Sequence, residues 1–346
     1  MINKQYKFIL LFILLLFGLL FIYFTISYSI NNNKIIEGIQ FYSNEFADDY
    51  SDLNIKYDKI NKKLIRQYPN KVKIFDCKNI NPKNSNKITN NKYYTSDLLN
   101  KNNIPVPKFM LYNTNNKIMN NHNLEYPIVV KTLSGTGGIG VIMNNNNIHD
   151  LEKSLNKSNS YDKLLIEEQL VGNDYRLLVY NNEIIDVLLR NKPYVIGNGK
   201  DNITKLVETY NKNLKQGQFK IHNVDTKVLK EQDKNLNSIP SIREKVIVSK
   251  VCNYHNGSKI NRIPLDTVHV DNIDMVLKAV NITGSKLSGV DFISKDISVS
   301  WKKNGGKIIE INNGPGLIIH KYAIDSEKQN IPKLFFTKLF EPFINL

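Results

Sequence analysis

The sequence has only two cysteines in 346 residues, Cys77 and Cys252. Two cysteines do not make the disulfide framework of a small secreted domain. Neither stands in a motif typical of a catalytic nucleophile, and no zinc-ligand spacing occurs along the chain. We therefore expect both cysteines to be structural, and we look for the chemistry among other residue types.

A compact run of basic residues is also missing, although the chain is strongly basic. Its 47 Lys and Arg residues outnumber 32 Asp and Glu residues, which gives a formal net charge of +15. Such a surplus can attract nucleic acid, anionic lipid or an acidic substrate. The lysines are dispersed among asparagines, and no aromatic motif typical of RNA-binding domains is present. We expect no nucleic-acid partner, whereas an acidic substrate fits the charge.

Long hydrophobic runs are absent except at the N-terminus. Phe8 to Phe24 is apolar apart from Gly18 and Tyr23, and a weaker apolar stretch continues to Ile30. This is roughly the 20 residues that cross a bilayer. A cleaved signal peptide, with an apolar core of about 7–15 residues, is the alternative. We predict a membrane anchor at residues 1–30, with residues 8–30 in the lipid bilayer.

The stretch KTLSGTGGIGV, from Lys131 to Val141, lacks the features that would complete two familiar nucleotide-binding loops. Gly135, Gly137 and Gly140 have dinucleotide-binding spacing, but that motif needs a following helix. Here a second short strand follows instead, and the Gly-Lys-Ser/Thr of a Walker loop is absent. Glycine N–H groups, hydroxyls and a lysine still suit a phosphate. An ordinary glycine hairpin is the alternative.

Strand and helix patterns alternate irregularly through the rest of the chain, which favours an α+β fold over a doubly wound parallel sheet. Residues 31–85 are polar and show no clean period, so we interpret them as a linker and a reduced lead-in segment. Residues 86–346 would form the main domain. Apolar periodicity predicts helices at Asn91–Asn103, His149–Asn159, Ile203–Tyr210 and Val270–Val280, and strands at Tyr126–Lys131, Lys163–Leu170, Tyr175–Tyr180, Glu183–Arg190, Leu287–Ser294 and Lys307–Asn312.

Three oxygen-bearing side chains lie at the ends of two predicted strands. Glu310 and Asn312 are two residues apart and therefore point to the same face, with Ile311 on the other. Asp291 ends the apolar stretch Leu287–Asp291. If the strands pair, these oxygens would suit Mg²⁺, which takes its remaining ligands from water and phosphate. The alternative is three unrelated polar residues at strand ends.

From about Asn91 to Tyr322 the chain resembles the ATP-grasp family, most closely the ATP-grasp domain of cyanophycin synthetase. It is more distantly similar to the glutathione synthetase, ribosomal S6 modification and D-alanine–D-alanine ligase branches. The resemblance is carried by Asn91-Lys-Tyr-Tyr-Thr95, Ile104-Pro-Val-Pro107, Val129-Val-Lys131 with its glycine loop, Gly172-Asn-Asp-Tyr-Arg-Leu-Leu-Val179, Ile196-Gly-Asn-Gly-Lys200, Gly289-Val-Asp291 and Ile308-Ile-Glu-Ile-Asn-Asn-Gly-Pro-Gly316. It implies two α+β lobes that grip ATP.

The resemblance also implies a role for each matching residue. ATP would be held by Lys92, Lys131, Ser134, Gly135, Gly138 and Gly140 at its phosphates, by Glu167, Glu168 and Leu170 at adenine, and by Asp174 at the ribose. Asp291, Glu310 and Asn312 would hold one or two Mg²⁺ ions, which Mn²⁺ could replace. Arg176, Arg190 and Lys250 would stabilise charge on the transferring phosphoryl group.

The implied reaction joins a carboxylate to an amine with release of ADP and phosphate. An acyl-phosphate is the intermediate, and no protein nucleophile is needed. A small-molecule kinase and a non-catalytic, membrane-tethered ATP-binding module are the alternatives. The substrate-side stretch of the family differs here, since Lys250 replaces an arginine and Ser258 a glycine. We therefore expect a different acceptor, an amino acid or acidic peptide, and His255 is either a substrate contact or a loop residue.

The predicted anchor does not determine on which side of the membrane the main domain lies. Lys4 and Lys7 precede the apolar run, and Glu37, Glu45 and Asp48 follow it. This lysine bias places the N-terminus in the cytoplasm and the main domain on the opposite side. ATP is most abundant in the cytosol, which favours the reverse orientation.

Overall fold

The computed structural model describes most of the chain after its N-terminal segment. The described residues are 46–114, 123–135, 138–214, 218–250, 257–324 and 329–341. The predicted membrane anchor at residues 1–30 lies outside them, as does His255. Among the helices within these ranges, none combines the length and the apolar character needed to cross a membrane.

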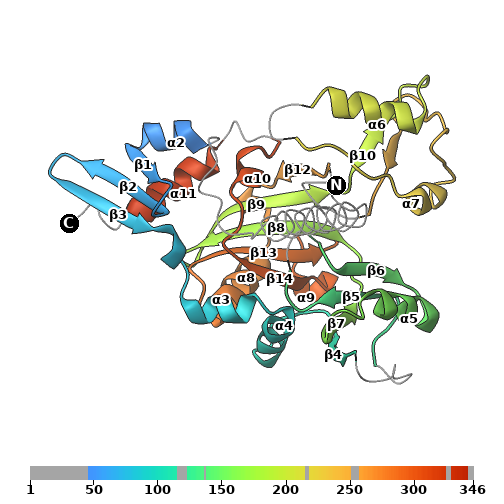
Figure 1. The fold of residues 1–346 in the computed structure, drawn as a ribbon, viewed down its shortest axis with the longest axis horizontal. Helices are drawn as coiled ribbons and strands as arrows, with labels where there is room; N and C mark the ends of the chain where they lie inside the picture. The colour runs from blue at the N-terminus through green and yellow to red at the C-terminus, as the bar shows by residue number, and fades with distance from the viewer. Residues whose placement is uncertain are drawn as a thin grey trace, which may run out of the picture. The chain divides into compact units, whose positions relative to one another are not determined.

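A five-stranded antiparallel sheet stands at the centre of the described fold, and its strands lie side by side in Figure 1. The strand order is β12-β9-β8-β13-β14. The turn at Asn181–Asn182 joins two of the strands, and both residues have positive φ values, 47° and 64°, as this type of two-residue hairpin requires. The strands are β8 (Asn173–Tyr180), β9 (Glu183–Asn191), β12 (Lys259–Arg262), β13 (Leu287–Ser294) and β14 (Lys307–Asn313).

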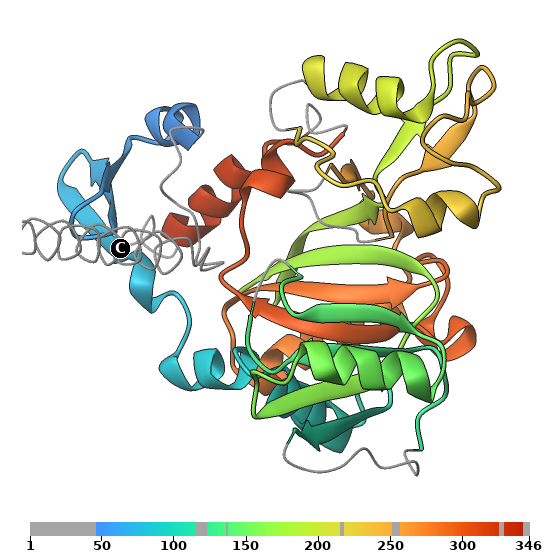
Figure 2. The ribbon, with the colours of Figure 1, turned by 45° about the vertical axis from the view of Figure 1, so that its right-hand side comes forward.

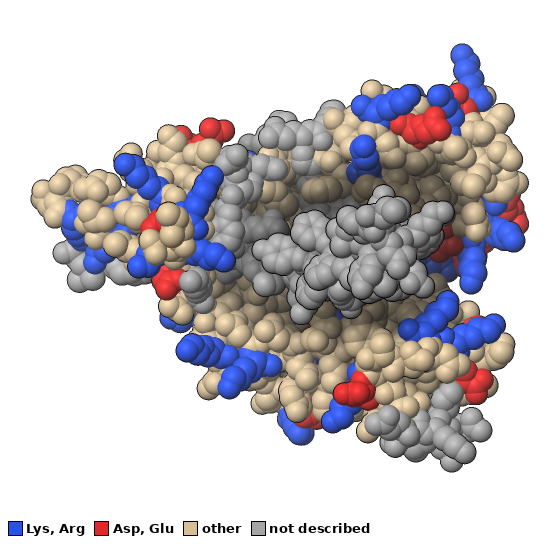
Figure 3. Space-filling model, viewed as in Figure 1, with Lys and Arg blue, Asp and Glu red and all other residues tan. Residues whose placement is uncertain are grey.

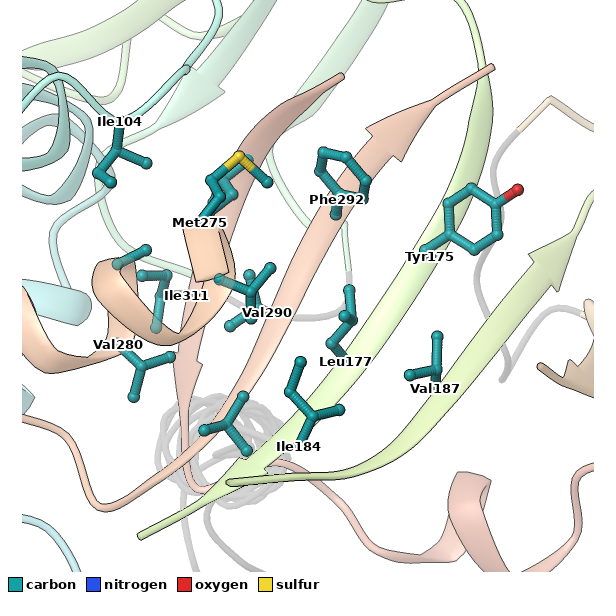
Figure 4. Packing of buried hydrophobic residues seen from close by; sticks show 14 of the residues in the cluster. Ile104, Tyr175, Leu177, Ile184, Val187, Met275, Val280, Val290, Phe292 and Ile311 are labelled. Atoms are coloured by element: carbon teal, nitrogen blue, oxygen red, sulfur yellow. The ribbon is translucent and has the colours of Figure 1, made fainter. Parts of the chain in front are cut away.

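One face of this sheet is apolar and is covered by helices. Helix α8 (Val270–Thr283) packs there through Met275 and Val280, and α4 (Lys92–Lys101) adds Leu99. Figure 4 shows the inward-pointing strand residues, which include Leu177, Val187, Val290 and Ile311. Because strand side chains alternate between faces, the polar residues between them emerge on the opposite face. This arrangement gathers the charged residues described below.

A second sheet, of four antiparallel strands, has the order β4-β7-β5-β6. Figure 2 shows α5 (Ile148–Lys157) lying across it, and the amphipathic helix buries Leu151 and Leu155 there. The predicted strand after the glycine loop is confirmed as β6. Strands β7 and β8 belong to different sheets. The segment between them, which includes Gly172, therefore connects the four-stranded sheet to the five-stranded one. The strands are β4 (Phe109–Asn113), β5 (Ile128–Thr132), β6 (Val141–Asn145) and β7 (Lys163–Glu168).

Two smaller units complete the described fold. The first has its own apolar core, which includes Val195, Leu229 and Val246. It comprises β10 (Tyr194–Ile196), α6 (Ile203–Lys212), α7 (Thr226–Lys230) and β11 (Lys245–Ile247). The second packs the C-terminal helix α11 (Ile331–Phe340) against the N-terminal elements α2 (Ala47–Asp52), β1 (Ile55–Asp58), β2 (Lys63–Tyr68) and β3 (Lys71–Asp76). The remaining helices are α3 (Lys83–Thr89), α9 (Trp301–Asn304) and α10 (Ile318–Lys321), with 3-10 turns at Cys77–Asn79 and Leu265–Thr267.

The N-terminal sheet is more regular than the linker and lead-in segment that the sequence predicted. Its third strand has an unusual pattern, in which Val72 and Ile74 are 49% and 60% exposed while Lys71 and Lys73 are less exposed. Polar and apolar residues do alternate along this strand, as in a half-buried strand, but here the apolar side is the more exposed one.

Basic side chains are spread over the surface as their spacing in the sequence indicates. On the face drawn in Figure 3, Lys and Arg side chains are scattered over several elements and lie among acidic ones.

Phe336→Ala should strongly destabilise the chain. The ring is fully buried and lies 4.9 Å from the Tyr50 ring and 6.0 Å from the Phe46 ring, measured between centroids. Emptying such a site costs about 3–5 kcal/mol of unfolding free energy. Lys333→Ala, at an exposed ion pair with Asp52, is the control and should change stability by less than about 0.5 kcal/mol. Urea denaturation followed by fluorescence measures both; equal stability of the two variants would contradict this packing.

Candidate active site

Two arginines and two aspartates form a buried network on the open face of the five-stranded sheet. Asp291 on β13 lies directly opposite Arg176 on β8, and Asp174 lies opposite Arg190 on β9. Arg176 Nη1 is 3.0 Å from Asp291 Oδ1, and Arg190 Nη2 is 2.6 Å from Asp174 Oδ1 and 3.2 Å from Asp291 Oδ1. Arg190 therefore bridges the two carboxylates.

Burial and neighbouring charges shift the pKa values of two groups in this network, Asp174 and Arg190. Burial raises the pKa of Asp174, as does the nearby charge of Asp291, while Arg190 opposes the shift. Burial alone would lower the pKa of Arg190, but Asp174 and Asp291 together raise it well above its ordinary value. Arg190 consequently remains a cation at every physiological pH, and it fixes the positions of both carboxylates.

The three predicted metal ligands lie together within the paired strands β13 and β14, where Asp291 and Glu310 are mid-strand rather than at strand ends. Asp291 pairs with Glu310 across the two strands, and Gly289 pairs with Asn312. The Nδ2 atom of Asn312 lies 3.4 Å from Asp291 Oδ2. The pairing is irregular beside Asp291: Asp291 pairs with Glu310, but the next residue, Phe292, pairs with Ile308. Because of this bulge, Glu310 lies on the charged face, whereas Ile308, two residues earlier, is buried on the other face.

This donor set fits a hard divalent cation. Two carboxylates and one amide can supply oxygen atoms, the ligand type that Mg²⁺ prefers. Within the described ranges, no three His, Cys, Asp or Glu side chains gather as a metal cluster. With two carboxylates and one amide, the three residues suit a Mg²⁺ ion whose remaining ligands are water or phosphate oxygens.

Lys92 connects these oxygens to the glycine loop. Its Nζ lies 2.9 Å from Glu310 Oε1 and donates to the backbone oxygen of Gly135 at 2.8 Å. Lys92 is the first residue of α4, where Asn91 caps the helix by accepting from the N–H of Tyr94. The cap and the first turn therefore hold a lysine between the two sheets.

The glycine loop is shaped by Thr132. Thr132 Oγ1 donates to the backbone oxygen of Ser134 at 2.8 Å, which curls the chain after β5. Gly140 has a φ of +73°, and a Cβ there would lie 2.6 Å from the Thr132 methyl group. Only glycine satisfies both conditions. The strand–loop–strand arrangement thus matches the predicted phosphate loop, of which Thr136 and Gly137 lie outside the described residues.

Lys131 and Glu167 form a buried ion pair beside this loop. Their side chains are only 9% and 3% exposed. Burial lowers the pKa of Lys131, but Glu167, Glu310 and Asp291 outweigh that effect and raise it overall. Lys131 therefore carries a positive charge toward the face that holds Glu310 and Asp291.

The remaining predicted residues are less closely gathered. Glu168 lies near two lysines, Lys108 at 3.3 Å and Lys307 at 3.4 Å, and Leu170 follows in the segment that links the two sheets. Lys250 pairs at 2.6 Å with Glu231, the residue that follows α7, so this ion pair lies in the small unit that contains α7. Sequence reasoning missed Asp186, Arg262 and His320, which are distant in sequence and meet on the charged face.

The fold and these contacts resemble those of an ATP-grasp domain: two β-sheets, with a lysine-bearing glycine loop beside a strand pair that carries acidic and amide side chains. Residues 89–221 match the family described as "RimK-like ATP-grasp domain". The chain is 29% identical over 266 residues to a glutathione biosynthesis bifunctional protein from Clostridium perfringens, covering 73% of this chain and 34% of that protein.

Two further comparisons agree. A cyanophycin synthetase from Trichormus variabilis is 26% identical over 225 residues, covering 62% of this chain and 25% of that protein. The crystal structure of a bifunctional glutathione synthetase from Pasteurella multocida superposes with a TM-score of 0.56 at 21% identity, over 84% of this chain and 41% of that chain. Residues 89–221 thus match a RimK-like ATP-grasp domain, and the chain spans about a third or less of the two sequence relatives.

Proposed function

We propose that this chain is an ATP- and Mg²⁺-dependent ligase that joins a carboxylate to an amine through an acyl-phosphate. The observation that carries the proposal is the contact of Lys92 with both Glu310 and the glycine loop. It joins the glycine loop, which we propose binds phosphate, to the strand pair that we propose binds Mg²⁺. The names of the relatives, which refer to glutathione and cyanophycin, support an amino acid or peptide as substrate.

ATP would lie between the two sheets. Lys92 and Lys131 would hold its phosphates as point charges, and Ser134, Gly135, Gly138 and Gly140 would cover them. Backbone groups from Glu167 to Leu170 would face adenine. Asp174 is engaged by Arg190, so binding of a ribose hydroxyl would use its remaining oxygen.

The charged network supplies the electrostatics of phosphoryl transfer. A bound Mg²⁺ on Asp291, Glu310 and Asn312 would neutralise phosphate charge. Arg176 and Arg190 would then stabilise charge that develops on the transferring group, because fixed cations act strongly in a water-poor site. When ATP binds, the Lys92 ammonium group would leave Glu310 and pair with a phosphate oxygen. Positioning of the carboxylate next to the γ-phosphate accounts for the rest of the catalysis.

Acid- and amine-dependent ADP release tests this function. Mg-ATP would be incubated with the chain, the standard amino acids and short glutamyl and aspartyl peptides, with each component omitted in turn. We expect ADP and phosphate only when an acid and an amine are both present. Phosphorylated product without an amine requirement would indicate a kinase, and ATP binding without turnover would indicate a binding module.

We further propose that residues 8–30 anchor the chain in a lipid bilayer. The support is the length of the apolar run from Phe8, which matches roughly 20 membrane-spanning residues. Leu15→Arg/Leu16→Arg should release the chain from carbonate-washed membranes, because an arginine at the bilayer centre costs about 2.5–3.5 kcal/mol. Leu15→Ile/Leu16→Ile should remain bound. A soluble natural chain that lacks its first 30 residues would instead establish a cleaved signal peptide.

A further inference from the structure

A histidine, an aspartate and an arginine form a second buried polar group on the charged face. Nδ1 of His320, on α10, lies 2.7 Å from Asp186 Oδ2. The other Asp186 oxygen accepts from Arg262 Nε at 2.9 Å. Arg262 also donates to the backbone oxygen of His320 at 2.7 Å and to that of Gln329 at 2.9 Å. Hydrogen bonds therefore hold both the ring and the backbone of His320 in place.

This group lies next to the proposed reaction centre. Asp186 on β9 pairs with Leu178 on β8, two residues from Arg176, which in turn pairs with Asp291. Residues two apart on a strand share a face, so Asp186, Arg176 and Asp291 all lie on the same side of the sheet. His320 follows β14 by seven residues, in the segment that continues from Asn313 through Pro315.

The free ring nitrogen of His320 is the notable feature. Arg262 Nε donates to one Asp186 oxygen, and the other is placed to accept the Nδ1 proton of His320, which leaves Nε2 as a bare acceptor. Nε2 is buried, and no described residue donates a hydrogen bond to it. Burial lowers the pKa of His320, as do the nearby Arg176 and Arg262, while Asp186 opposes the shift. A neutral imidazole with one unused acceptor results.

We propose that Nε2 of His320 takes the proton that the amine substrate loses before it attacks the acyl-phosphate. This inference rests on the proposed ligase function. The ammonium gives one proton to Nε2, and the amine forms the new C–N bond. The bond between the acyl carbon and the phosphate oxygen breaks, and the departing phosphate takes the second proton. Asp186 stabilises the imidazolium, which then returns its proton to solvent.

Burial sets a condition on this role. His320 has no exposed surface, so the side chains around it must give way for an amine to reach Nε2. A purely structural histidine would also be buried and fixed. The test therefore has to separate loss of proton transfer from loss of structure.

His320→Asn separates the two roles, because the asparagine amide can replace Nδ1 as the donor to Asp186 but has no atom in place of Nε2. The natural chain and the variant would be given Mg-ATP and the pool of amino acids and acidic peptides. Hydroxylamine, which is largely unprotonated at neutral pH, would trap the acyl-phosphate as a hydroxamate. The amino groups of the pool would form amides.

We expect His320→Asn to form hydroxamate within a few-fold of the natural rate but to lose amide formation by about 10²–10⁴-fold. Its amide formation should recover as pH rises, since the amine then deprotonates unaided. His320→Gln should behave in the same way. Equal loss of both products, or loss of neither, would overturn the role of His320. No hydroxamate from the natural chain would overturn the ligase function itself.

Discussion

Glu310→Gln should reduce ATP turnover by more than roughly 100-fold, since even residues that only orient a metal ligand are worth about 10–100-fold. The carboxylate of Glu310 lies 2.9 Å from Lys92 and faces Asp291 across β13 and β14. Glutamine keeps the length of the side chain and an oxygen that can accept from Lys92, but it removes the negative charge that suits Mg²⁺. The fold should be retained.

Binding measurements distinguish this loss from a general defect. Titration of the chain with Mn²⁺ in the presence of ATP should show a weaker metal site in Glu310→Gln. Glu183→Gln removes a carboxylate of the same type from an exposed pair with Lys338; it should leave both metal binding and turnover unchanged. Normal metal binding by Glu310→Gln would show that Glu310 is not a metal ligand.

Lys131→Met should destabilise the chain by about 3–5 kcal/mol, because it leaves the buried Glu167 carboxylate without its cation. It should also weaken ATP binding, since the buried cation near Glu310 and Asp291 is lost. Urea denaturation and calorimetric titration with Mg-ATP measure the two effects separately.

A double variant shows which effect belongs to the ion pair. Lys131→Met/Glu167→Gln no longer buries an unpaired charge, so it should recover much of the lost stability. ATP binding should remain weak. Lys333→Met, at the exposed pair with Asp52, is the matched control and should behave like the natural chain. Full ATP affinity in the double variant would contradict a phosphate-binding role for Lys131.

The gathering of Asp291, Glu310 and Asn312 could be predicted because it depends on local rules. Residues two apart on a strand share a face, and two apolar strands with polar ends were visible in the sequence. The bulge beside Asp291 could not be predicted. It depends on how β13 and β14 align, and a regular register would have placed Glu310 and Ile308 on the same face.

Long-range contacts account for most of what the sequence did not reveal. Asp186, Arg262 and His320 are separated by 76 and 58 positions, and no spacing rule links them. The ion pair between Asp174 and Arg190 could not be predicted either, although both residues had been predicted to belong to the site. Pairing of β8 with β9 brings these two side chains together, so sheet topology had to be known first.

Transfer of an oxygen atom from the acid to phosphate tests the central claim most directly. The amino acids and acidic peptides would carry ¹⁸O in their carboxylates, and the released phosphate would be analysed by mass spectrometry. An acyl-phosphate ligase must move one carboxylate oxygen into phosphate when the amine displaces it. The account predicts one ¹⁸O in each phosphate released with the amide product. Release of unlabelled phosphate alongside ADP would contradict an acyl-phosphate and therefore the proposed ligase mechanism.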